Sequence, residues 1–89
     1  MPSPQLPYHT VYILRSLPYP TQPYVGYTRN LEARLAAHNS GQSPHTRKFK
    51  PWIAETLICF SDKYLALAFE RYLKSHSGKA FARNRLLSC

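Results

Sequence analysis

Proline is concentrated at the beginning of the chain, where six of the eight prolines lie within the first 23 residues. Proline has no backbone N–H and a fixed φ, so it interrupts helices. We therefore expect residues 1–7 to form a proline-rich, non-helical leader. The prolines between Pro18 and Pro23 predict a loop, and the flanking segments Tyr8–Arg15 and Tyr24–Thr28 are rich in tyrosine and β-branched residues. This pattern predicts two strands that form a hairpin with a long connection.

A helix and a third strand are expected after the hairpin. Asn30 is a favourable N-cap for a helix over Leu31–His38, and Gly41 is the kind of residue that commonly ends one. Gln42–Pro51 predicts a basic loop. Trp52–Phe60 predicts a strand, and because it is apolar at most positions we expect it to lie at the centre of the sheet.

The last part of the chain predicts two more helices. The first covers Asp62–Ser75, is capped by Ser61 and ends before Gly78; the second covers Lys79–Leu87. Apolar residues of the first helix repeat at the spacing of one buried stripe, and they are Leu65, Phe69, Tyr72 and Leu73. The order of elements is strand, strand, helix, strand, helix, helix, which predicts an α/β protein of the α+β type.

The length and the cysteines limit the class of protein. A chain of 89 residues accommodates one small domain, which we place at residues 8–87. Cys59 and Cys89 are too few and too far apart for a zinc ribbon or a disulfide framework. Cys59 lies in an apolar run and is expected in the core, so reduced cysteines are favoured over a single disulfide. The sequence contains no signal peptide pattern and no apolar run of about 20 residues, so we expect a cytoplasmic location.

Charge indicates the kind of partner. The chain has 12 lysines and arginines but only 4 acidic residues, which gives a net charge of +8. Such a balance favours a polyanion, with nucleic acid ahead of an acidic membrane surface. The acidic residues are too dispersed for a pair of glycosidase carboxylates; they are Glu32, Glu55, Asp62 and Glu70.

Basic residues form two clusters in the sequence. One is the loop segment Arg47–Lys50, which includes Phe49, and the other begins at Arg71, after which no acidic residue occurs. These clusters predict a surface that binds successive phosphates of a nucleic-acid backbone. The alternative is that they are solvated faces that only promote solubility. Phe49 is expected either to stack on a base or to anchor the loop in the core.

One pair of residues and one single acidic residue are candidates for chemistry at a phosphate. Arg34 and His38 lie four residues apart and share a helix face, where arginine suits phosphate and histidine suits proton transfer. An exposed arginine beside a histidine that only stabilises the helix end is the alternative. Glu70 is a candidate ligand for Mg²⁺, or the partner of Lys74 in an ion pair.

The tyrosines of the hairpin have two interpretations. A tyrosine on a strand usually serves to pack the core. Tyr12 and Tyr24 differ because their strands are expected to pair, which would bring the two phenols together. Gly26, inside the second strand, predicts close approach by another backbone or by a ligand.

The segments that carry these residues occur in a recognisable order, and they are Thr10–Leu14, Tyr24–Gly26, Asn30–Gly41, Thr46–Arg47, Pro51–Trp52 and Glu70–Ser75. In this order they resemble the GIY-YIG nuclease superfamily. The likeness is to its small stand-alone bacterial members, which resemble the N-terminal domain of an excinuclease ABC component. It extends over nearly the whole chain, from residue 8 to residue 86. The sequence departs from the usual signature at Thr10, Val11, Val25 and Tyr27.

The resemblance implies a fold and a set of catalytic residues. The implied fold is a small three-stranded antiparallel sheet flanked by helices. Tyr12 and Tyr24 would frame the attacking water, and Arg34 would bind the scissile phosphate. His38 would assist proton transfer, and Glu70 would hold one divalent metal ion, either Mg²⁺ or Mn²⁺.

The resemblance also implies a substrate. We expect a metal-dependent endonuclease that hydrolyses DNA phosphodiester bonds in repair or recombination, with RNA as the alternative substrate. The expected nucleic-acid contacts are Gly26, His45, Arg47, Lys48, Lys50, Arg71, Lys74 and Lys79. The competing interpretations are a binding module that does not cut and a subunit that takes its specificity from a protein partner. A chain without a separate recognition domain should have weak sequence preference alone.

Overall fold

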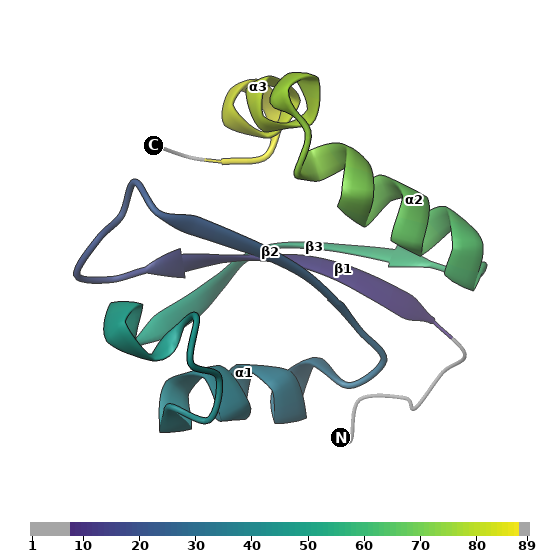
Figure 1. The fold of residues 1–89 in the computed structure, drawn as a ribbon. Coiled ribbons are helices and arrows are strands. Elements are labelled where there is room, and N and C mark those ends of the chain that lie inside the picture. Colours follow the sequence, from purple (N-terminus) through teal and green to yellow (C-terminus); the bar gives the residue numbers. More distant parts are fainter. Residues whose placement is uncertain (1–7, 88–89) are drawn as a thin grey trace.

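The computed structural model describes residues 8–87. The predicted proline-rich leader and Cys89 lie outside these residues. Three strands form one antiparallel sheet in the order β2-β1-β3, and they are β1 (His9–Ser16), β2 (Pro23–Thr28) and β3 (Trp52–Phe60). Helix α1 (Leu31–Ser40) covers one face of the sheet, while α2 (Lys63–Leu73) and α3 (His76–Arg85) cover the other (Figure 1). The α+β fold expected from the sequence is confirmed.

The central strand is β1, so the expectation that Trp52–Phe60 would be central is wrong. β1 pairs with both neighbours, and its segment 11–14 is buried on both faces of the sheet. β3 lies at an edge, and Leu57 and Cys59 on it are exposed. The expected core position of Cys59 is therefore also wrong, because apolar composition alone does not distinguish a half-covered edge strand from a buried one.

Local capping explains where the helices begin. The Asn30 side chain accepts a hydrogen bond of 3.1 Å from the Ala33 N–H, and Gly41 ends α1 with a left-handed φ of 84°. Both roles agree with the sequence prediction. Asp62, rather than the expected Ser61, caps α2, and a short 3₁₀ turn, η1 (Arg47–Phe49), lies inside the predicted basic loop.

Gly78 does not separate the last two helices, as the sequence suggested, but lies inside α3. Ser75 caps this helix by accepting a hydrogen bond of 3.1 Å from the Gly78 N–H. A Cβ atom on Gly78 would overlap the carbonyl oxygen of Tyr72 in α2. Glycine is therefore present because the two helices pack backbone to backbone at this point.

Each face of the sheet has its own core. Alternate β1 residues pack toward α2 and α3 in one cluster, which contains Val11, Ile13, Ala66, Leu73 and Ala82. The other cluster contains Tyr12, Leu14 and Trp52, with half-buried residues of α1 and η1 packed around it.

The stripe expected on α2 is only partly right. Phe69 packs against the core and Leu73 is buried in it, but Leu65 and Tyr72 are exposed. Ala66 occupies the buried position that the sequence analysis gave to Leu65. Within residues 8–87, no helix has both the length and the apolar character needed to cross a membrane.

The contact at Gly78 yields a stability prediction. Glycine to alanine inside a helix normally stabilises it, but in Gly78→Ala the new methyl group meets the α2 backbone. We expect the variant to lose about 1–3 kcal/mol of unfolding free energy, as overpacked sites do. Urea denaturation measures this loss. The exposed neighbour Ser77→Ala is the control and should change stability by less than about 0.5 kcal/mol. A stabilised Gly78→Ala protein would contradict the close helix packing.

Candidate active site

Pairing of β1 with β2 brings two tyrosines to one face of the sheet. Tyr12 lies opposite Gly26, and Leu14 lies opposite Tyr24, so the two phenol rings are neighbours with centroids 6.4 Å apart. The close approach at Gly26 is made by a side chain and not by the backbone or ligand that the sequence suggested, because a Cβ atom there would overlap the Tyr12 hydroxyl. The missing side chain gives the Tyr12 ring its place across β2.

His38 meets both tyrosines from the last turn of α1. Its Nε2 atom lies 3.2 Å from the Tyr12 hydroxyl oxygen, and its ring stands edge-on to Tyr24 at a centroid distance of 5.0 Å. The side chain is only 1% exposed. It is therefore a buried member of a polar cluster and not merely a charge at the helix end.

Thr46 holds the other nitrogen of the His38 ring. The Nδ1 atom of His38 lies 2.8 Å from the Thr46 hydroxyl oxygen, and both side chains are buried. The Trp52 indole donates a hydrogen bond of 2.9 Å to the Thr46 carbonyl. Asn39 exchanges two further bonds with the Trp52 backbone, at 2.6 and 3.0 Å. These bonds join α1, the loop before β3 and β3 itself around His38.

Sequence reasoning assigned no role to Thr46 or Asn39. Both act through partners far away in the sequence or in another element, and neither belongs to a periodic pattern. Both residues lie in segments that carry the family resemblance, Asn30–Gly41 and Thr46–Arg47, but nothing in those segments pointed to their hydrogen-bond partners.

Burial and nearby charges set the protonation of the cluster. Burial raises the pKa of Tyr12, while the Arg34 guanidinium opposes that rise and the charges of Tyr24 and Glu70 add to it. Burial also lowers the pKa of His38, and the positive charge of Arg34 lowers it further. At neutral pH the structure therefore contains a neutral histidine against a protonated tyrosine.

Comparison with known families identifies this arrangement. Residues 8–84 match the model of the GIY-YIG catalytic domain. The chain belongs to the GIY-YIG family. The tyrosine strands and the α1 histidine and arginine are thus parts of a GIY-YIG catalytic domain, which confirms the family suggested by the sequence.

Relatives of two kinds share this domain. The chain is 39% identical over 74 residues to the structure-specific endonuclease subunit SLX1 of Debaryomyces hansenii, covering 75% of this chain but 21% of that protein. It is 42% identical over 57 residues to a UPF0213 protein of Bacillus licheniformis, covering 63% of this chain and 59% of the relative. The chain therefore spans about a fifth of the SLX1 relative and less than two thirds of the Bacillus relative.

A solved structure supports the fold. The UPF0213 protein BH0048 from Bacillus halodurans superposes with a TM-score of 0.53 at 29% sequence identity. The superposition covers 86% of this chain and 83% of the other.

Glu70 is the candidate metal ligand of this GIY-YIG domain. Its side chain is 20% exposed and forms an ion pair of 3.1 Å with Lys74, which confirms the ion-pair interpretation. The charge of Glu70 also contributes to the raised pKa of Tyr12. Within residues 8–87, no three histidine, cysteine or acidic side chains gather into a metal cage. A single carboxylate fits an ion such as Mg²⁺, which keeps most of its waters.

The basic residues expected to contact nucleic acid lie on two sides of the sheet. The four in the loop after α1 are exposed near that helix, and they are His45, Arg47, Lys48 and Lys50. The other three are exposed on or beside α2 and α3, across the sheet (Figure 1), and they are Arg71, Lys74 and Lys79. The structure does not join the two groups into one patch. Phe49 packs against the Tyr12 cluster, so the core-anchor interpretation is the right one.

The neutral state of His38 predicts how stability depends on pH. An unfolded histidine titrates near pH 6.5, and the pKa of the folded His38 is lower. Between these values the unfolded chain binds more protons, so the unfolding free energy should fall as the pH decreases below about 6.5 and stay level above it. Urea denaturation between pH 5 and 8 measures this dependence.

The control for this experiment is another histidine. His38→Gln should remove most of the pH dependence, whereas His45→Gln, an exposed histidine in the loop, should keep it. Equal pH dependence in the His38→Gln and wild-type proteins would show that the buried cluster does not hold a neutral histidine.

Proposed function

We propose that this chain is a metal-dependent endonuclease that hydrolyses phosphodiester bonds in DNA. The observation that carries the proposal is the convergence of groups from separate elements on the Tyr12 hydroxyl. His38 contacts it directly, and the charges of Arg34 and Glu70 both act on it. Membership of the GIY-YIG family supports this activity, as does similarity to a protein described as a structure-specific endonuclease subunit.

Tyr12 and His38 together provide a route for the proton of an attacking water. The raised pKa of Tyr12 makes a free phenolate scarce at neutral pH. With Nδ1–H donating to Thr46, the Nε2 atom of His38 accepts the hydrogen bond of Tyr12. Tyr12 takes a proton from water as it passes its own to His38, so no isolated phenolate forms.

Arg34 supplies the positive charge for the phosphate. It is exposed on α1, one helical turn before His38, and its charge reaches the Tyr12 hydroxyl. A phosphodiester is already anionic, so charge that grows on its oxygens in the transition state needs compensation. Guanidinium is suited to this role because it donates two parallel hydrogen bonds to phosphate oxygens.

Glu70 would hold the divalent metal ion, either Mg²⁺ or Mn²⁺. When bound, such an ion supplies a Lewis acid at the phosphate. Lys74 forms an ion pair with the carboxylate of Glu70 on α2.

The choice of DNA structure, the repair setting, the cytoplasmic location and a protein partner remain predictions. A partner is favoured by one observation: large apolar side chains are exposed on α2, including Tyr64 at 79% and Leu65 at 59%. In a small domain such residues are typical of an interaction surface. The SLX1 relative is itself described as a subunit.

Arg34→Ala tests the phosphate role. Cleavage should fall by at least about 100-fold, as for loss of one transition-state donor, while the fold is retained because alanine suits an exposed helix position. Single-turnover cleavage of labelled DNA with Mg²⁺ measures the rate. Lys63→Ala, which removes a positive charge from an exposed position at the start of α2, is the matched control and should retain activity. A folded Arg34→Ala protein that cuts at the wild-type rate would exclude Arg34 from catalysis.

Glu70→Gln tests the metal role. The variant should not cut, and its binding to DNA without metal should be equal to wild type or slightly tighter, since one repelling carboxylate is gone. In the wild type, Mg²⁺ and DNA should each tighten the binding of the other by the same factor. That linkage should disappear in the variant, and DNA titrations with Mg²⁺ and with EDTA measure it.

Glu32→Gln is the matched control for this loss of charge, because Glu32 is exposed in the first turn of α1. It should preserve both cleavage and the effect of Mg²⁺. If Mg²⁺ promotes DNA binding equally in the Glu70→Gln protein, the metal lies at another position.

A further inference from the structure

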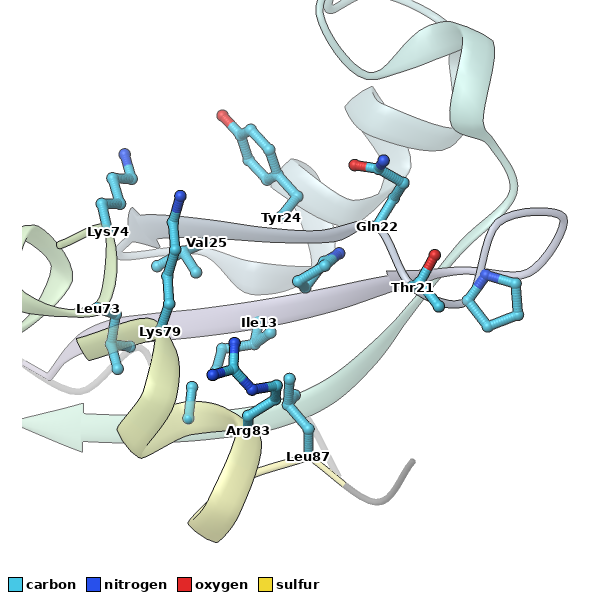
Figure 2. Close-up of a pocket in the computed structure, with 13 residues that line it drawn as sticks. Ile13, Thr21, Gln22, Tyr24, Val25, Leu73, Lys74, Lys79, Arg83 and Leu87 are labelled. Atoms are coloured by element: carbon cyan, nitrogen blue, oxygen red, sulfur yellow. The ribbon is translucent and has the colours of Figure 1, made fainter. Parts of the chain in front are cut away.

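A groove lies between the hairpin and the last two helices. Its volume is about 660 Å³, within the range of pockets that enclose a ligand, roughly 300–1,000 Å³. One wall is formed by the β1–β2 connection and the start of β2, at residues 20–25, and the other by the end of α2 and by α3 (Figure 2). The apolar side chains inside include Ile13, Val25, Leu73, Ala82 and Leu87.

The residues of β2 that line the groove place it along an edge of the sheet. Successive side chains of a strand point to opposite faces. Tyr24 packs into the cluster on the α1 face and Val25 into the cluster on the other face, yet both residues line the groove. The groove therefore passes along the edge of β2 that faces away from β1. Within residues 8–87, no strand pairs with this edge.

The helical wall of the groove is positively charged. Lys74, Lys79 and Arg83 line it, and among the lining residues, all within residues 8–87, none is acidic. Lys79 and Arg83 lie four residues apart in α3 and therefore share a helix face. Figure 2 shows that the polar ends of Tyr24, Lys74 and Lys79 extend past β2 on the side away from β1. These cations therefore flank the space beside the unpaired edge of β2.

The unpaired edge of β2 suits a ligand that has a peptide backbone. An edge strand presents a row of N–H and C=O groups, and an extended peptide can pair with both kinds. The backbone of a nucleic acid has no N–H donors. Pro23, the first residue of β2, also lacks an N–H, so pairing with an added strand would involve Tyr24 and the residues after it.

Charge decides which peptide suits the groove. The chain has a net charge of +8, and pairing of β2 with the β2 of a second copy would bring the lysines beside both strands toward each other. Like charges in that arrangement oppose association. An acidic segment has the opposite charge, so the groove favours a different, acidic protein over a second copy of this chain.

We propose that this groove binds an extended, acidic segment of a partner protein, which adds to the three-stranded sheet as a further strand beside β2. On the face of the segment that is turned to α3, an apolar side chain would enter the interior between Ile13 and Leu73. Carboxylates two residues before and after it would meet Lys79 and Arg83. The proposal goes beyond the endonuclease function, because it gives the predicted protein partner a chemistry and a docking site.

The first experiment measures docking of a defined peptide. One face of the extended peptide carries glutamate, valine and glutamate, and the other face carries serine. It is titrated in EDTA into the isotope-labelled protein, and methyl NMR signals are followed. Signals of Ile13, Val25 and Leu73 should shift, while those of Leu31 and Leu35, which lie on the α1 face, should not. Shifts confined to other surfaces, or no binding, would overturn the proposal.

The second experiment separates strand addition from simple attraction of charge. Two peptides with the same side chains are methylated on alternate backbone nitrogens, each in one of the two possible phases. Every second amide of an added strand pairs with its neighbour. One methylated peptide should therefore lose about tenfold in affinity or more, the value of one or two hydrogen bonds, and the other should bind like the unmodified peptide. Equal affinities of the two methylated peptides would contradict strand addition.

The third experiment tests the cations with two variants of α3. Arg83→Gln should reduce affinity for the unmodified peptide by about tenfold, which is the value of one charge-assisted hydrogen bond. Arg85→Gln is the matched control, because Arg85 is exposed on the same helix but does not line the groove. It should change affinity by less than about twofold, as an exposed charge does. Equal losses in both variants would mean that the peptide binds net charge rather than the groove.

An oligothymidylate of equal charge is the rival ligand. If it shifts the groove signals and displaces the peptide at a lower concentration than unlabelled peptide does, the groove is a nucleic-acid site and the proposal fails. None of these measurements uses cleavage. A protein that binds the peptide but cuts no DNA would keep the docking site and lose the endonuclease function, and a protein that cuts DNA but does not bind the peptide would do the reverse.

Discussion

The hydrogen bond between Tyr12 and His38 connects the centre of the sheet to α1, and the rest of the site is arranged around it. Two buried polar groups are tolerated in a small core only if both find partners. Thr46 satisfies the far side of the His38 ring, and Trp52 fixes the Thr46 backbone. The packing of this core therefore depends on the same buried side chains that form the candidate site.

β2 contributes side chains to the cores on both faces of the sheet. Gly26 on this strand leaves space for Tyr12, while Tyr24 contacts His38 on the α1 face and also lines the groove beside α3. The hairpin therefore contributes residues both to the tyrosine cluster and to the groove.

Features with local signals were predictable from the sequence, and features made by tertiary contacts were not. Asn30 and Gly41 mark the ends of α1 through geometry that the sequence shows directly, whereas the central strand depends on which strands pair. Tyr12 and Arg34 were found because each belongs to a contiguous segment of an ordered set. Thr46 lies in a segment of the same set, but its bond to a histidine on another element was not predicted. The groove was missed because only the packing of α3 against the hairpin side of the sheet brings its walls together.

Lys74 pairs with the acidic side chain of Glu70 and also lines the groove, so a substitution of Lys74 has two separate effects. Its ammonium group holds the carboxylate of Glu70, and it also lines the groove. Removing it would free the carboxylate for a cation and at the same time take positive charge away from the groove that we propose binds an acidic segment, so the affinities for a cation and for an anion change in opposite directions. A single variant at Lys74 therefore combines both effects, and a double-mutant cycle with Glu70 is needed to separate them.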